Sequence, residues 1–216
     1  RVKTIVCHLG NGASICAVKY GQVVDNSMGF TPLEGLVMGT RCGDVDAGAL
    51  EYLAKKENLD FQQIMTILNQ ESGVLGISSN FSSDFRELKD AEIKYNDKAA
   101  LAREIFVYRV AKYIGSYAAA MNGVDNIVFT AGVGENDSDI REQICEYLEF
   151  LGIAIDEVKN REQGEAVRIS DGASRVNVLV VKTNEELEIA REAAAVAAQV
   201  KENRELKAKG AAHHAE

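Results

Sequence analysis

Three strand-like segments open the sequence, and only short turns separate them. Residues 2–8, 13–19 and 22–26 have the length and the β-branched content of strands. The glycines around Asn11 and the corner at Tyr20 and Gly21 leave room only for tight turns, which join antiparallel neighbours. The sequence therefore predicts that the chain begins with three consecutive antiparallel strands.

Helices and strands alternate over the rest of the chain. Apolar spacing predicts helices over 46–57, after Asp60, over 97–122, over 138–151 and after Asn184, and strands over 126–131 and 175–182. Residues 72–85 are rich in turn-forming residues. The order β-β-β-α-β-α-β-α predicts an α/β fold, in which helices pack on a mixed sheet. We expect one domain over 1–203 and a frayed, charged tail over 204–216.

Composition limits the classes of function. The formal net charge of −9 argues against nucleic acid as a partner, because phosphate backbones require clustered Lys and Arg. The sequence holds no apolar run long enough to span a bilayer and no signal peptide, so we expect no membrane partner and a cytoplasmic location. The cysteines, which form no CxxC pair, are expected to be reduced thiols. The absence of an initiator Met indicates a fragment or a processed chain.

The stretch from His8 to Ser14 is the first candidate site. The third glycine of a dinucleotide fingerprint is missing after Gly10 and Gly12, and no Gly-Lys-Ser/Thr of a P-loop follows. A glycine turn between antiparallel strands can present N–H groups to an anion, with Asn11 and His8 as additional donors. The local pattern by itself favours the alternative, which is a plain hairpin with a histidine in the core.

A second glycine-containing loop is predicted over residues 129–136. It follows a buried strand and precedes a helix, at the edge where ligands bind in open α/β sheets. Gly132 and Gly134 would let the backbone approach a flat or phosphorylated ligand. A purely structural turn is an equally good interpretation of this pattern.

Isolated charged residues give weaker signals. Arg41 lies among glycines, where it is either an exposed side chain or directed at an anion. Asp84 and Arg86 follow a turn. Glu185 begins the final helix, where the helix dipole by itself favours an acidic residue, although a carboxylate there could also reach Mg²⁺.

Taken together, these segments resemble the acetate, propionate and butyrate kinases of the actin-like phosphotransferase superfamily. The resemblance rests on motifs in the family's order, over residues 2 to about 195: HLGNGAS, SMGFTPLEGLVMGTRCGD, SGVLGIS, TAGVGEN and TNEEL. It implies an actin-like, ribonuclease H-like domain. Family members have two such domains with the active site between them, so the resemblance implies that this chain is the carboxyl-terminal half.

The family motifs also imply roles for individual residues. His8 and Arg41 match the positions at the phosphoryl-transfer site, and Glu185 matches a magnesium ligand. The remaining matches are to positions that contact nucleotide or phosphate: Asn11, Gly12, Asp84, Phe85, Arg86, Gly132, Val133, Gly134, Glu135 and Asn136.

The resemblance implies Mg²⁺-dependent transfer between ATP and acetate, giving ADP and acetyl phosphate, in a homodimer. Direct transfer is expected, although acidic residues in the loops leave a phosphoenzyme open. A propionate or butyrate kinase, and a nucleotide-binding and dimerisation module without turnover, are the alternatives. The long apolar helix over 97–122 is the candidate dimer surface.

Overall fold

The computed structural model describes the backbone of residues 1–213 and the side chains of residues 1–200. By its internal contacts the chain divides into two units, residues 1–182 and residues 183–216. The second unit contains α8 (Glu185–His213), whose backbone takes in residues 204–213 of the predicted tail. Residues 214–216 lie outside the described residues.

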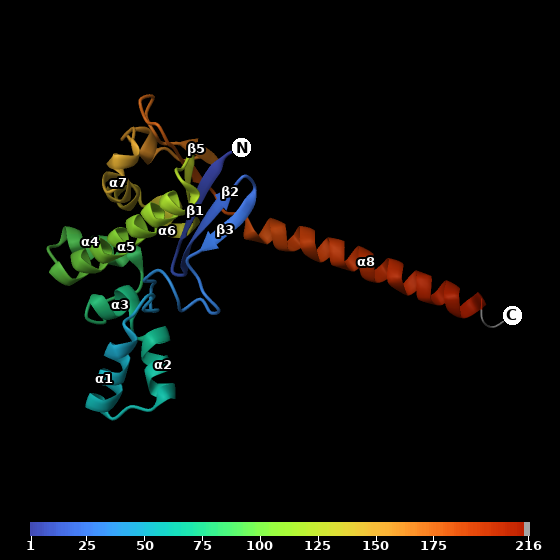
Figure 1. The fold of residues 1–216 in the computed structure, drawn as a ribbon, viewed down its shortest axis with the longest axis horizontal. Helices are drawn as coiled ribbons and strands as arrows, with labels where there is room; N and C mark the ends of the chain where they lie inside the picture. The colour runs from blue at the N-terminus through green and yellow to red at the C-terminus, as the bar shows by residue number, and fades with distance from the viewer. Residues whose placement is uncertain (214–216) are drawn as a thin grey trace. The chain divides into compact units, whose positions relative to one another are not determined.

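The first unit is built on one mixed sheet (Figure 1). Its strands are β1 (Lys3–Leu9), β2 (Ala13–Lys19), β3 (Gln22–Asn26), β4 (Asn126–Thr130), β5 (Ala166–Arg168) and β6 (Asn177–Val181), in the spatial order β3-β2-β1-β4-β6-β5. The first three strands are antiparallel, as predicted, whereas β1, β4 and β6 are parallel. This arrangement confirms the predicted mixed sheet and adds β5, a short antiparallel edge strand.

One face of the sheet carries the main core. Alternate residues of each strand are fully or almost fully buried, among them Ile5, Cys7, Leu9, Ile15, Ile127, Phe129, Val178 and Val180. The helix α5 (Asp97–Met121) packs against β1 and β2, and α6 (Ala131–Asn136) packs against β1, β4 and β6. Because strand side chains alternate between faces, His8 lies on the face opposite Cys7.

Helix α5 is the central helix of the first unit. It packs against α3 (Gly73–Ile77), α4 (Phe85–Ile93) and α7 (Ser138–Glu146) as well as the sheet. Its buried residues include Phe106, Val107, Val110, Ile114 and Met121. The apolar stripe of this helix is therefore used inside the unit and is not available to a second copy, whereas the assembly of the chain into a dimer stays a prediction.

Several predicted boundaries are also wrong. The turn-rich region around 72–85 contains α3 and leads directly into α4, and the predicted glycine loop over 129–136 contains the helix α6. The helix predicted over 138–151 ends at Glu146, and a separate 3₁₀ turn, η1 (Glu149–Leu151), follows it. Short helices such as α3 and α6 depend on tertiary contacts rather than on propensity, so an analysis of local periodicity misses them.

Helices α1 (Ala47–Glu57) and α2 (Phe61–Gln70) lie beyond the end of the sheet at which β1 turns into β2 (Figure 1). Asp60 caps α2 with a complete capping box, in which its carboxylate accepts from the Gln63 N–H and the Gln63 side chain accepts from the Asp60 N–H. No helix among the described residues is both long enough and apolar enough to cross a membrane. All four cysteines have free thiols.

Candidate functional site

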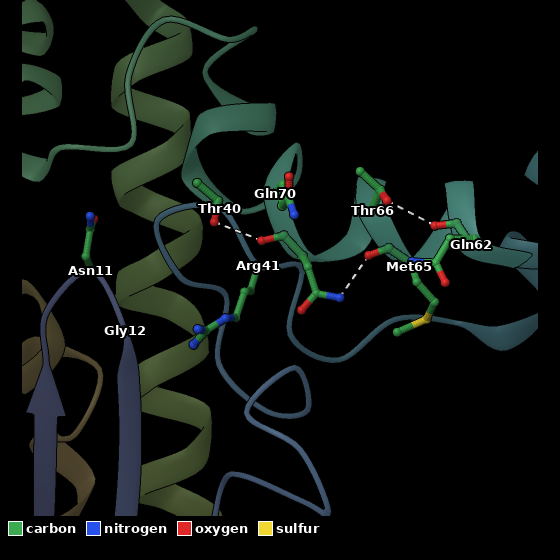
Figure 2. Close-up of a pocket in the computed structure, with 9 residues that line it drawn as sticks. Asn11, Gly12, Thr40, Arg41, Gln62, Met65, Thr66 and Gln70 are labelled. Carbon is green, nitrogen blue, oxygen red and sulfur yellow. Dashed lines mark hydrogen bonds between the residues drawn. The ribbon is translucent and has the colours of Figure 1, made fainter.

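The predicted turn and the predicted arginine lie next to each other. Arg41 extends towards the β1–β2 turn, and a Cβ built on Gly12 would lie 3.9 Å from its Nη1. Figure 2 shows the Arg41 guanidinium near this turn, opposite side chains of α2. A cavity of about 720 Å³, here called the Arg41 cavity, is lined by Asn11, Gly12, Thr40, Arg41, Gln62, Met65, Thr66, Asn69 and Gln70. A guanidinium in such a polar cavity can bind an anion through two parallel N–H donors, in a bidentate geometry.

Backbone contacts hold the β1–β2 turn and residues 39–44, here called the Arg41 loop, together. The Gly39 N–H donates to the Asn11 carbonyl over 2.9 Å. A Cβ on Gly39 would lie 2.6 Å from Asn11 Oδ1, so a side chain at position 39 would displace the Asn11 side chain from its present position. The Gly10 N–H donates to the Gly12 carbonyl and closes the turn itself, so this N–H is not one that the turn presents to an anion.

The other end of the Arg41 loop is attached to α5 by one carboxylate. Asp44 accepts hydrogen bonds from Arg109, from the Tyr113 hydroxyl over 2.9 Å and from the Gly35 N–H over 3.1 Å. Burial and the hydrogen bond to Asp44 raise the pKa of Tyr113 to about 12. Sequence reasoning assigned no role to Asp44, although it belongs to the Gly-Thr-Arg-Cys-Gly-Asp string.

A second cavity collects most of the residues matched to nucleotide contacts. This cavity of about 770 Å³, here called the Asp84 cavity, is lined by Gly10, Asn11, Asp84, Phe85, Arg86, Lys89, Asp90, Gly132, Val133, Asn136 and Asp137. The residues come from the β1–β2 turn, from the start of α4 and from α6, which are far apart in the sequence. Asn11 lines both cavities, so the two adjoin at the turn.

On the α4 wall, the residues from Asp84 to Arg86 form a compact group. Asp84 caps α4, and Arg86 donates to both oxygens of its carboxylate, from Nε over 3.1 Å and from Nη2 over 2.6 Å. The Arg86 side chain hydrogen-bonds and attracts this carboxylate, which lowers the pKa of Asp84 to about 2. Phe85 is buried against Phe106, with ring centroids 4.5 Å apart, and thereby attaches this wall to α5.

On the opposite wall, α6 starts directly at the end of β4. Ala131 has a positive φ of 65°, which is uncommon for a residue with a Cβ and is a local strain of the kind found at functional sites. Glu135 accepts from the Ala131 N–H over 2.8 Å, and the Asn136 side chain donates to the Gly132 carbonyl. These side chains therefore stabilise α6 itself.

A buried arginine supports α6 from behind. Arg141 is 2% exposed and donates through Nη1 to the carbonyls of Gly134 and Glu135, each over 2.9 Å. Its Nε donates to Asn160 Oδ1 over 2.8 Å. Gly134 thus contributes to the site through its backbone, and neither it nor Glu135 is among the residues that line the Asp84 cavity.

A second buried arginine lies behind both walls. Arg103, on α5, is 2% exposed and donates to Glu92 of α4 over 2.6 Å and to Asp137 over 2.7 Å. Lys89 lies 3.4 Å from the same Asp137 and 2.8 Å from Asp139. Burial acts to raise the pKa of Asp137, but the hydrogen bond and charge of Arg103 and the charge of Lys89 outweigh it and lower that pKa. The sequence signal for Arg103 was the presence of a charged residue within the apolar pattern of α5.

Two further predicted residues lie outside these linings. By register His8 lies between Ser14 of β2 and Thr130 of β4, and its ring is half-buried on the second face of the sheet. His8 is not one of the described residues that line either cavity. Glu185 is the exposed first residue of α8 and is described within the second unit alone.

The described residues contain no group of three or more His, Cys, Asp or Glu side chains arranged to hold a metal ion. Three carboxylates line the Asp84 cavity, and two of them have cationic partners, since Asp84 pairs with Arg86, and Asp137 with Arg103 and Lys89. Mg²⁺ is commonly bound through one or two carboxylates, water and substrate phosphates, so a phosphorylated ligand would supply most of its ligands.

Comparison with known proteins identifies the family of the chain. The Acetokinase family profile matches residues 1–191. The chain is 58% identical over 200 residues to an acetate kinase of Helicobacter hepaticus, an alignment that covers 93% of this chain and 50% of the relative. It is 58% identical over 193 residues to the acetate kinase of Thermotoga maritima, with coverage of 88% and 48%. The chain therefore spans about half the length of the curated relatives it matches.

Solved structures give the same result for the fold. The Porphyromonas gingivalis acetate kinase superposes with a TM-score of 0.85 at 49% identity, covering 88% of this chain and 48% of that one. A propionate kinase from Francisella tularensis gives a TM-score of 0.83 at 44% identity, covering 89% and 49%. These matches confirm the predicted actin-like α/β fold. The family profile matches most of the length of this chain, and the chain therefore belongs to the acetokinase family.

Proposed function

We propose that this chain is the nucleotide-binding half of an acetate kinase, which transfers a phosphoryl group between ATP and acetate to give ADP and acetyl phosphate. One observation carries the proposal: segments far apart in the sequence meet around the Asp84 cavity, and Asn11 connects that cavity to Arg41. A nucleotide bound between α4 and α6 would direct its phosphates towards the β1–β2 turn. The guanidinium of Arg41 lies beside Gly12 of that turn and would be close to those phosphates.

Each residue has a role that suits its chemistry. Phosphoryl transfer requires positioning and neutralisation of charge on the equatorial oxygens, and Arg41 supplies a permanently charged fork for this purpose. Asn11 and Gly12 orient the phosphates at the junction of the two cavities. His8, which lines neither cavity, would donate a hydrogen bond to the oxygens of the phosphoryl group being transferred. The α4 and α6 walls bind the nucleoside.

Mg²⁺ enters this proposal as part of the nucleotide substrate, and the role of Glu185 as a magnesium ligand stays a prediction from its match to the family motif. The ion would neutralise charge on the nucleotide phosphates. The division of the chain into a domain over 1–203 and a tail over 204–216, and the assembly into a homodimer, also remain proposals.

Two alternatives are favoured by particular observations. A module that binds nucleotide without turnover is one alternative, because both cavities are lined by residues of this chain alone. The match to a propionate kinase keeps propionate as an alternative acceptor. Both alternatives share the nucleotide site and differ in what the rest of the protein supplies.

Calorimetric titration of the chain with Mg²⁺·ADP tests the nucleotide site. We expect saturable binding that is weakened by Arg86→Ala and unchanged by Arg161→Ala, an exposed arginine of η2 (Lys159–Arg161) outside both cavity linings. Absence of binding by the unaltered chain would refute the proposal. A hydroxylamine assay for acyl phosphate, run with acetate and with propionate, distinguishes the enzyme from the module.

A further inference from the structure

The two walls of the Asp84 cavity come from elements that are not consecutive in the chain. One wall is the first part of α4, and the other is α6 with the start of α7. Helices α4 and α7 both pack against α5, so α5 forms the common support behind the cavity. The separation of the walls therefore depends on how α5 contacts each of them.

Arg103, on that support, contacts the last turn of α4 and Asp137 of the second wall. Its Nε donates to Glu92 on α4 over 2.6 Å, and its Nη1 donates to Asp137 over 2.7 Å. Asp137 joins α6 to α7, lines the cavity and caps α7 by accepting from the Ile140 N–H over 3.3 Å. A single planar guanidinium, 2% exposed, thus connects the two walls in a defined geometry.

Lys89 makes a second connection on the cavity side. Its ammonium lies on α4 and bridges Asp137 over 3.4 Å and Asp139 over 2.8 Å. Asp137 is therefore held between two cations, one buried and one at the cavity. Without Arg103, Asp137 would keep its cap to the Ile140 N–H and one long ion pair to Lys89, so the shorter Arg103 bond is the strongest constraint on its carboxylate.

We propose that Arg103 is a positioning residue that sets the separation of the α4 and α6–α7 walls and thereby the affinity for nucleotide. The inference rests on the proposed nucleotide site and extends it to a residue outside the cavity lining. A buried ion pair adds little net stability compared with apolar residues of similar size, whereas its hydrogen bonds define geometry. Arg103 is thus better explained by the position of the walls than by stability.

The direct test replaces Arg103 with Met and measures Mg²⁺·ADP binding to the chain by calorimetry. We expect the dissociation constant to rise by roughly tenfold, which corresponds to about 1.4 kcal/mol. Hydrogen–deuterium exchange without nucleotide should increase in both walls, residues 85–93 and 131–136. Arg103→Lys, which retains the charge but not the fork, should restore only part of the affinity.

Two further variants make the test decisive. Arg103→Met leaves Asp137 buried beside one cation, so Arg103→Met/Asp137→Asn supplies a variant without that uncompensated charge, and the amide oxygen can still cap α7. Removing the negative charge of Asp137 should by itself strengthen binding of the anionic nucleotide. Weaker Mg²⁺·ADP binding by the double variant would therefore be strong support for the positioning role of Arg103. Ile114→Ala, about three turns along the same helix, is the control for general destabilisation.

The outcomes separate the two proposals. If the unaltered chain does not bind Mg²⁺·ADP, the proposed function and the role of Arg103 both fail. If the unaltered chain binds, and folded variants lacking Arg103 bind equally well, only the positioning role fails. Equal weakening by Ile114→Ala also overturns that role, because a general loss of stability would then explain the effect.

Discussion

Asn11 is the residue at which the two cavities meet, and its position depends on the absence of a side chain at Gly39. The Asn11 carbonyl accepts from the Gly39 N–H, and its Oδ1 occupies the space that a Cβ at position 39 would need. Gly39 precedes Arg41 by two residues. The same glycine therefore sets both the turn and the start of the loop that carries the arginine.

Gly39→Ala is expected to displace Asn11 and to weaken nucleotide binding. The added methyl group meets Asn11 Oδ1 at 2.6 Å, and because this atom ends an exposed side chain that can move aside, the unfolding free energy should change by only about 0.5 kcal/mol. Gly115→Ala is the matched control, because a Cβ at this position of α5 meets nothing within 4 Å. Replacing a mid-helix glycine should stabilise the chain by about 0.5–1 kcal/mol. Urea unfolding and Mg²⁺·ADP calorimetry measure both effects, and an Asn11-dependent site is refuted if Gly39→Ala binds normally.

At the scale of elements, α5 serves as the support for both cavities. It contacts the Arg41 loop through Arg109 and Tyr113, and it contacts the two walls of the Asp84 cavity through Arg103 and Phe106. The helix thus uses its apolar stripe for the core and its polar residues for the position of the loops. This explains why its polar positions are informative about the site.

Tyr113→Phe tests the attachment of the Arg41 loop to α5 through the pH dependence of stability. The pKa of Tyr113 is raised to about 12, so the folded state favours the protonated phenol. Its contribution is fully present below the ordinary tyrosine pKa of about 10 and is lost as the pH rises towards about 12. The variant should lose about 1 kcal/mol or less at neutral pH.

Unfolding by urea between neutral pH and pH 12 provides the measurement for this prediction. The unaltered chain should lose more stability over the alkaline part of the range than Tyr113→Phe does. Tyr95→Phe, at a side chain that is 94% exposed, should follow the unaltered chain. Identical alkaline slopes for Tyr113→Phe and the unaltered chain would contradict the role of this phenol.

At the scale of the whole molecule, the chain contains an actin-like unit that corresponds to about half of its relatives. Its two adjoining cavities meet at the β1–β2 turn, where Arg41 lies close to Gly12. In the proposed enzyme, binding of nucleotide belongs to this half, whereas turnover also requires groups from the remaining half.

Arg41→Ala in the full-length protein should therefore affect turnover much more than nucleotide binding. Loss of one transition-state contact typically costs about 3–4 kcal/mol, which is roughly a hundredfold to a thousandfold in turnover. The hydroxylamine assay measures turnover and calorimetry measures binding, with Arg161→Ala as the surface control. Unchanged turnover, or a loss confined to nucleotide affinity, would exclude a role of Arg41 at the transferred phosphoryl group.

The sequence by itself determined that the first three strands are antiparallel neighbours, and it determined the positions of the tight turns between them. Short turns at Gly10–Gly12 and at Tyr20 allow only antiparallel neighbours, and apolar periodicity identified α5 because its stripe is long. The motif strings were sufficient to indicate the family. These are local properties, which depend on residues within a few positions of one another.

Only the tertiary structure decided how the site is assembled. Helices α3 and α6 are too short for a periodic signal and form because neighbouring elements hold them. The Arg103–Asp137 pair joins residues 34 positions apart, and Lys89–Asp137 joins residues 48 positions apart. Such contacts depend on how the helices pack around α5. Local spacing therefore indicated which residues could bind a ligand, whereas packing decided which of them share a cavity.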